Sequence, residues 1–128
     1  MSVTKYSKLV RDNIPEIIEA SGKSFVCEVL SDDRYLEMLD AKLHEELAEY
    51  QASKSMEELA DLLEVIRAVA LARGSCIEEV EALRIAKAET NGAFSKKLLL
   101  KEVCEQPDHL LIYRKTVDWS LLSGLVTA

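Results

Sequence analysis

The chain has 128 residues, of which 23 are acidic and 16 basic, so its formal net charge is −7. A hydrophobic fraction of 48% with 30% charged residues is typical of a folded globular domain and argues against a disordered chain. A negative net charge disfavours binding to nucleic-acid polymers, whose phosphates require basic partners. The length is that of one domain, and we expect residues 1–128 to form a single domain.

The sequence also bears on the location of the protein. No apolar run approaches the roughly 18 residues of a membrane span, and residues 1–11 lack the apolar segment of a signal peptide. Cys27, Cys76 and Cys104 are odd in number and widely spaced, which disfavours a disulfide framework. We therefore expect a cytoplasmic protein with no membrane partner.

The first elements predicted along the chain are a short helix and a strand. Asn13-Ile-Pro-Glu16 has the N-cap residue, early proline and following glutamate of a helix start, and Gly22 is expected to end this helix. Residues 25–30 are rich in β-favouring side chains, which predicts a strand.

Three longer helices follow, each with apolar residues at helical spacing. The predicted ranges are about 32–52, 55–73 and 75–90. Asp32 and Asp33 are the expected N-caps of the first of these helices. The capping boxes Ser55-Met-Glu-Glu58 and Ser75-Cys-Ile-Glu78 are expected to open the other two.

The C-terminal third has a weaker pattern. Residues 97–103 and 110–113 are β-favouring and predict two further short strands. The fold class predicted for the whole chain is therefore mainly α, with an antiparallel helical hairpin or bundle and minor short β-strands.

The acidic residues are concentrated in the middle of the chain. Between Glu37 and Glu64 there are nine acidic and two basic residues, so this stretch carries the whole net charge of −7. Such a charge density favours the binding of cations, or of anions that are bridged to the acidic residues by cations.

Two acid pairs in this stretch, Glu46-x-x-Glu49 and Glu58-x-x-Asp61, are symmetric about the expected turn. Their three-residue spacing places each pair on one face of its helix, beside the apolar stripe. In an antiparallel hairpin, Glu49 lies opposite Glu58, and the same register places Glu46 opposite Asp61. Converging carboxylates repel one another unless a hard cation binds them, so the pattern predicts a site for Mg2+ or Mn2+.

Simpler interpretations of these acids stay open. A single Glu-x-x-Glu pair is most often a solvated helix face, and Glu58 also fits the capping box that begins at Ser55. Glu45, Glu57 and Glu64 fit ordinary surface positions on their helices.

Four segments together resemble a known family. They are Tyr6-Ser-Lys-Leu-Val-Arg-Asp-Asn-Ile-Pro-Glu-Ile-Ile18, Glu45-Glu-Leu-Ala-Glu49, Glu57-Glu-Leu-Ala-Asp-Leu-Leu-Glu-Val65 and Asn91-Gly-Ala-Phe94. The chain resembles the MazG-like all-α nucleotide pyrophosphohydrolases, especially their phosphoribosyl-ATP-pyrophosphohydrolase-like branch. The resemblance covers about residues 6–103 and leaves 105–128 as a C-terminal extension. It implies a MazG-like domain that assembles as a dimer or tetramer.

The resemblance implies Mg2+-dependent hydrolysis of a nucleoside triphosphate to a monophosphate and pyrophosphate, as in the removal of non-canonical nucleotides. The expected ligands of the ion are Glu46, Glu49, Glu58 and Asp61, and these four acids are also the expected catalytic residues. Glu45 is expected to accept a proton from the attacking water or to orient it. Two alternatives remain: a phosphoribosyl-ATP pyrophosphohydrolase of histidine biosynthesis, and a non-catalytic helical interaction module.

Four residues are candidates for contacts with the phosphates of a nucleotide substrate: Lys8, Arg11, Lys87 and Asn91. Lys87 is a candidate because the family that the chain resembles has a basic residue with this role at about this position. Asn91 follows four residues later on the same helix face. For Lys8 and Arg11 the alternative is a salt bridge that anchors the N-terminal segment to the acidic hairpin.

Overall fold

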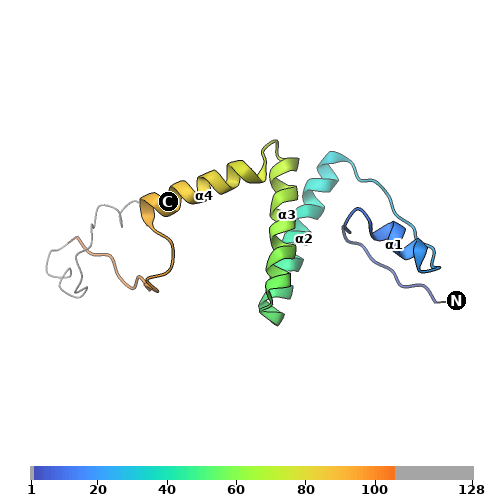
Figure 1. Cartoon of the computed structure of the whole chain (residues 1–128), viewed down its shortest axis with the longest axis horizontal. Coiled ribbons are helices and arrows are strands. Elements are labelled where there is room, and N and C mark those ends of the chain that lie inside the picture. The colour runs from blue at the N-terminus through green and yellow to red at the C-terminus, as the bar shows by residue number, and fades with distance from the viewer. Residues whose placement is uncertain (1, 106–128) are drawn as a thin grey trace. The chain divides into compact units, whose positions relative to one another are not determined.

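The computed structural model describes residues 2–105, and this part of the chain contains four α-helices (Figure 1). They are α1 (Ile14–Ala20), α2 (Asp32–Ser53), α3 (Met56–Ala72) and α4 (Ile77–Asn91). The prediction of a mainly helical chain is therefore confirmed for the described residues.

The strands predicted at residues 25–30 and 97–103 are wrong, since neither range forms a strand in the described structure. A strand needs a neighbouring strand to pair with its backbone N–H and C=O groups, and β-favouring side chains alone do not supply one. The strand predicted at 110–113 lies outside the described residues.

The N-cap of α2 is a serine and not one of the expected aspartates. The Ser31 hydroxyl accepts a hydrogen bond from the backbone N–H of Arg34. Asp32 and Asp33 instead occupy the first turn, where their negative charge interacts favourably with the helix dipole. At the start of α1, the side chain of Asn13 makes no capping hydrogen bond.

The capping box predicted from Ser75 is also wrong. Helix α4 begins at Ile77, so Ser75 lies one residue too early to be its N-cap. The Ser75 hydroxyl donates a hydrogen bond to the carboxylate of Glu79 instead.

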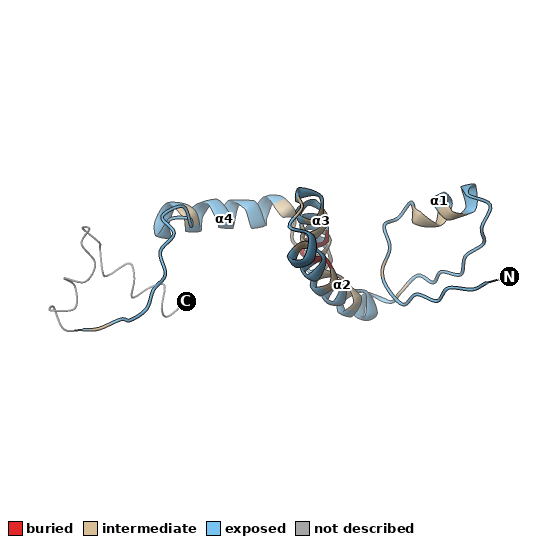
Figure 2. Ribbon diagram, turned by 90° about the horizontal axis from the view of Figure 1, so that it is seen from below, coloured by how far each residue is buried: buried red, intermediate tan, exposed pale blue. Residues whose placement is uncertain are grey.

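Helices α2 and α3 pack side by side in opposite directions (Figure 1). Lys54 ends α2 in the left-handed region of backbone space, with φ of 58°. Ser55 then caps α3 by accepting a hydrogen bond from the backbone N–H of Glu58. Figure 2 shows the buried positions in red where the two helices face each other. Within residues 2–105 the buried apolar residues are Leu39, Val65 and Ala70.

The chain divides into two compact units, Met1–Val80 and Glu81–Ala128, with the boundary inside α4. The first unit holds α1, α2, α3 and the N-terminal segment, which we define as residues 2–13. The described part of the second unit holds the rest of α4 and residues 92–105. None of the helices within residues 2–105 combines the length and the apolar character that crossing a lipid bilayer requires.

Candidate metal centre

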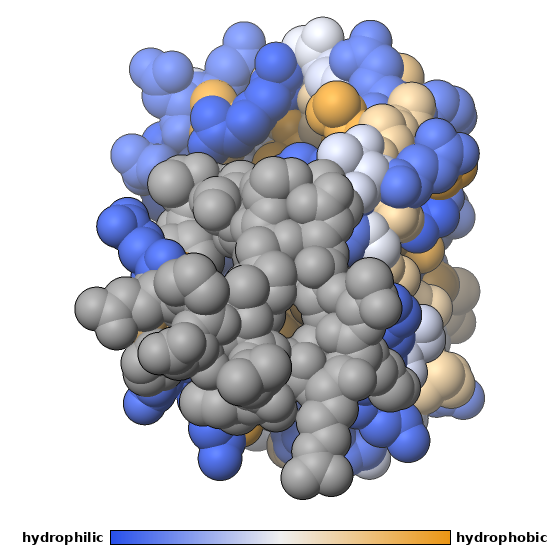
Figure 3. All heavy atoms as spheres, turned by 90° about the vertical axis from the view of Figure 1, so that its left-hand side faces the viewer, coloured by the Kyte–Doolittle hydropathy of each residue, from blue (hydrophilic) through white to orange (hydrophobic). Residues whose placement is uncertain are grey.

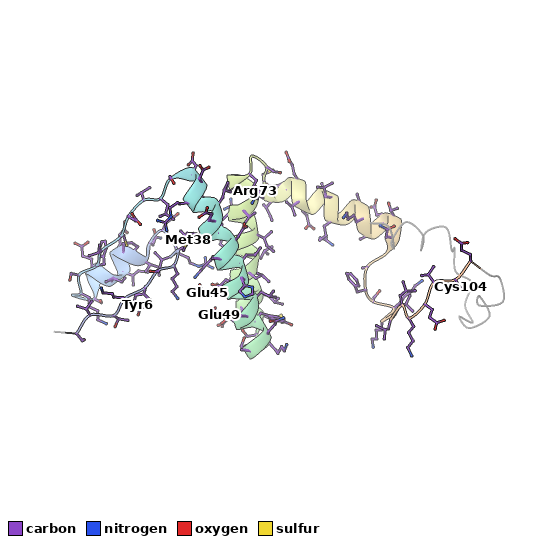
Figure 4. The ribbon with its side chains drawn as sticks, turned by 180° about the vertical axis from the view of Figure 1, so that it is seen from behind. Tyr6, Met38, Glu45, Glu49, Arg73 and Cys104 are labelled. Atoms are coloured by element: carbon purple, nitrogen blue, oxygen red, sulfur yellow. The ribbon has the colours of Figure 1, made fainter. Side chains whose placement is uncertain are left out.

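The structure gathers the five predicted acids into two groups in the first unit. Carboxylate oxygens of Glu45, Glu46 and Glu49, all on α2, lie within 4.8 Å of one another. Oxygens of Glu46, Glu58 and Asp61 lie equally close and connect α2 to α3. Glu46 belongs to both groups, which we call together the acid cluster. Figure 4 labels Glu45 and Glu49, which lie one turn apart on α2.

The grouping differs in one respect from the expected register. Glu46 lies near Asp61 as expected, but Glu58 is grouped with Glu46 and not with Glu49. The expected register describes only the backbone positions of an ideal antiparallel hairpin. Because Glu58 and Asp61 lie one turn apart on α3, both side chains can reach the same acid on α2.

Glu46 is the central residue of the acid cluster. It is only 6% exposed, and one of its oxygens, Oε1, lies 3.4 Å from Nζ of Lys42. The other oxygen, Oε2, is buried and has no hydrogen-bond partner within residues 2–105. Burial raises the pKa of Glu46, the nearby Glu49 raises it further, and Lys42 acts in the opposite direction. A buried oxygen without a partner is costly, so this atom is suited to bind a cation or a proton.

The carboxylate of Glu58 takes no part in the cap of α3. In a capping box it would accept a hydrogen bond from the backbone N–H of Ser55. That N–H donates instead to the hydroxyl of Ser53, at 3.2 Å. Oε2 of Glu58 is buried and has no hydrogen-bond partner in the described part of the chain. Capping therefore does not account for the position of this side chain.

Two basic residues of the N-terminal segment contact the acid cluster. Nζ of Lys8 lies 3.2 Å from Oε1 of Glu45, and Nη2 of Arg11 lies 2.8 Å from Oδ1 of Asp61. These are the salt bridges that the sequence left open as an alternative to phosphate binding. The hydrogen bond to Glu45 and the charge of that carboxylate raise the pKa of Lys8.

Lys42 was not among the residues predicted for the site. Its Nζ lies 3.4 Å from oxygens of both Glu45 and Glu46, and its side chain is only 18% exposed. Burial acts to raise the pKa of Glu45, but Lys8 and Lys42 outweigh it and lower that pKa. The spacing of three and four residues before the two acids was the signal in the sequence, because such residues share a helix face.

An open groove of about 930 Å³ adjoins the acid cluster and is lined by α2, α3, residues 9–14 and Ile17. Its lining includes Arg11, Glu46 and Asp61. It also includes Tyr35 and apolar residues of α3. Tyr35 precedes Glu46 by eleven residues, which is about 16 Å along a helix. The groove thus offers charged and apolar side chains beside the acid cluster.

The remaining predicted residues, Lys87 and Asn91, belong to the second unit. Both are exposed on α4 and lie one turn apart. Their contact with phosphate stays a prediction.

The donor set of the acid cluster fits a hard divalent cation. Carboxylate oxygens are preferred ligands of Mg2+ and Mn2+. The acid oxygens of each group lie within 4.8 Å of one another, so one ion could contact more than one of them. Exposed acids gather on many helices without binding an ion. The features that distinguish this cluster are the buried oxygens of Glu46 and Glu58, which have no hydrogen-bond partner within residues 2–105.

Comparisons with known proteins add a relative without an assigned activity. No protein-family model and no solved structure matches this chain. An uncharacterized protein of Mycolicibacterium smegmatis (strain ATCC 700084 / mc(2)155) is 57% identical over 47 residues, which are 37% of this chain and 48% of that protein. The chain thus spans about half the length of this curated relative.

Proposed function

We propose that this chain is a Mg2+-dependent nucleotide pyrophosphohydrolase. In this reaction water attacks a phosphorus of the bridge between the α- and β-phosphates, the bond to the bridging oxygen breaks, and a nucleoside triphosphate yields a monophosphate and pyrophosphate. The resemblance of the sequence to MazG-like proteins suggests this reaction, with Mn2+ as an alternative ion. The chemistry of the acid cluster supports it.

The observation that carries the proposal is the state of Glu46. Its carboxylate is buried at the junction of two acid groups, and one of its oxygens has no partner in the described structure. An ordinary solvated helix face does not bury a carboxylate in this way, since the lost hydration is not replaced. A cation site gives this burial a function.

Each side chain of the acid cluster then has a role. Glu46, Glu49, Glu58 and Asp61 would hold the ion. A bound Mg2+ ion lowers the pKa of a coordinated water and neutralises charge on the phosphates. Glu45 is paired with Lys8 and Lys42, which lower its pKa and make it a weak base. While the pair with Lys42 persists, Glu45 is suited to orient the water and not to accept its proton.

The proposal includes self-association as a dimer or tetramer. Few apolar residues are buried within residues 2–105, and large apolar side chains of α2 and α3 remain exposed. On the face drawn in Figure 3, apolar residues in orange and tan lie at the surface among hydrophilic ones in blue. A second copy of the chain would cover such a surface.

The test is pyrophosphate release from a panel of canonical and damaged nucleoside triphosphates and phosphoribosyl-ATP, with Mg2+ and with EDTA. The wild type should release pyrophosphate from at least one compound, and EDTA should abolish the release. Glu46→Gln should lower the rate by about 10–100-fold or more, judging by the losses that changes next to metal sites cause.

Glu37→Gln is the matched control, because Glu37 is exposed on α2, belongs to neither acid group and is not among the residues that line the groove. It should leave the rate within a few-fold of the wild type. Equal rates for Glu46→Gln and wild type would contradict the proposed site. If the wild type releases pyrophosphate from no compound, the chain is better interpreted as an interaction module.

A further inference from the structure

We propose that the N-terminal segment is a strap whose basic residues compete with the divalent cation for the acid cluster. Arg11 and, beside it, Lys8 would hold the segment on the acids until the ion binds. This inference rests on the proposed function, because it concerns the regulation of the same site.

The strap is joined to the acid cluster by two long-range contacts. Arg11 binds Asp61, fifty residues later, at 2.8 Å, and Lys8 binds Glu45, thirty-seven residues later, at 3.2 Å. Asp61 is one of the four acids proposed to hold the ion, and Glu45 belongs to the other acid group. The guanidinium therefore binds a carboxylate that a metal ion would also bind.

The contact of Arg11 is exposed enough to be exchanged. The side chains of Arg11 and Asp61 are 61% and 41% exposed, so water and salt screen their attraction. An exposed ion pair of this kind changes the binding constant of a competing ion by at most about fivefold. A divalent ion that binds several carboxylates at once should displace one such contact.

Lys42 behaves differently, because it is largely buried and contacts Glu45 and Glu46 from the same helix. It compensates part of the negative charge whether or not the strap is bound. The exchangeable positive charge is thus confined to the N-terminal segment.

Displacement leaves Arg11 beside the site, since it also lines the groove that adjoins the acid cluster. A guanidinium freed from Asp61 can bind phosphate oxygens of a ligand in that groove. The salt bridge and the phosphate contact expected from the sequence then describe two states of one residue.

The first measurement is calorimetric titration of the full chain with Mn2+. Arg11→Gln should bind Mn2+ more tightly than the wild type, by up to about fivefold. Arg67→Gln is the matched control, because Arg67 lines the same groove but pairs with Glu64, outside the acid cluster. It removes the same charge without removing a competitor, so it should change the affinity much less.

The second measurement is limited proteolysis of the wild type with trypsin, which cleaves after basic residues. Mn2+ should speed cleavage after Lys8 relative to cleavage after Lys101, an exposed lysine of the second unit. In Glu45→Gln, where Lys8 has lost its partner, cleavage should already be fast without Mn2+.

The outcomes separate this inference from the proposed function. Suppose that the wild type binds Mn2+ but Arg11→Gln binds it no more tightly, or that Arg67→Gln increases the affinity as much as Arg11→Gln does. Either result contradicts the proposed role of the strap but leaves the proposed metal site supported. The same holds if Mn2+ slows or does not change cleavage after Lys8. If neither the wild type nor Arg11→Gln binds Mn2+, the metal site itself fails and the strap fails with it.

Discussion

Glu46 shows how one buried side chain links stability to function. The charged groups around it are Lys42, Glu45 and Glu49 on α2 and Glu58 and Asp61 on α3. Burial next to these acids raises the pKa of Glu46, so its charged form is disfavoured in the folded chain. Burial of the charge therefore lowers the free energy of unfolding when no cation is bound.

This argument predicts the effect of Glu46→Gln on stability. Since the pKa of Glu46 is higher in the folded than in the unfolded chain, its ionisation destabilises the fold above the folded pKa. At neutral pH without metal, Glu46→Gln should be more stable than the wild type. The difference should narrow as the pH falls through the raised pKa towards the ordinary value of 4.5. Urea unfolding of both proteins between pH 4 and 8 in EDTA measures this difference in the free energy of unfolding.

Addition of Mn2+ should reverse this order of stability. An ion that binds only the folded state raises the free energy of unfolding of the wild type, whereas the glutamine variant lacks a ligand for it. Glu64→Gln should behave as the wild type at every pH and with Mn2+. A glutamine variant that is less stable than the wild type at neutral pH without metal would show that the contact with Lys42 outweighs the cost of burial.

At the scale of elements, the start of α3 matters because it sets the position of Glu58. The Ser55 hydroxyl accepts a hydrogen bond from the backbone N–H of Glu58. The backbone N–H of Ser55 donates a hydrogen bond to the hydroxyl of Ser53. This arrangement fixes the first turn of α3 without using the carboxylate of Glu58. The acid is thereby positioned by the cap and kept available for the acid cluster.

Replacement of the capping serines should show which caps are present. Ser55→Ala should lower the free energy of unfolding by about 1 kcal/mol, and Ser31→Ala should have an effect of similar size. Ser75→Ala should change it by less than about 0.5 kcal/mol, because Ser75 is not an N-cap. Denaturant unfolding of the three variants measures these effects. An equal loss for Ser75→Ala would indicate that the capping box predicted from the sequence is present after all.

The same elements show what the sequence could predict. Helix positions follow from apolar spacing and from local start and stop signals, and α1 to α4 lie within a few residues of the predicted ranges. The spacing of the acid pairs likewise anticipated a group that includes Glu46 and Asp61. These features depend on residues close in sequence or on a short turn between two helices.

The features that could not be predicted from the sequence depend on contacts between residues that are far apart along the chain. The two β-favouring ranges at 25–30 and 97–103 have no strand to pair with in the described structure, and nothing in their own residues reveals this. The choice between phosphate binding and a salt bridge for Arg11 depends on a residue fifty positions away. The burial of Glu46 depends on the packing of α2 against α3, which its charge alone would not suggest.

At the scale of the molecule, the packing of α2 on α3 leaves an apolar surface of α3 exposed within the described residues. Met56, Leu59 and Leu63 recur on successive turns of α3 and are exposed, and none of them lines the groove beside the acid cluster. A single pair of packed helices buries little apolar area, and small helical chains commonly complete their core by association. A second copy that buries this stripe would leave the groove open.

The last prediction follows from this surface. The wild type should be at least a dimer in light scattering at micromolar concentration, well above the monomer mass of 14.3 kDa. Leu63→Lys places a charge within the exposed stripe, where burial against a second copy would leave it unpaired, so it should shift the protein towards the monomer. Gln51→Lys adds the same charge at an exposed position of α2 and should leave the mass unchanged. A monomeric wild type would contradict the proposed assembly, and an unchanged mass for Leu63→Lys would place the interface on another face, because a buried lysine without a partner is incompatible with a stable apolar contact.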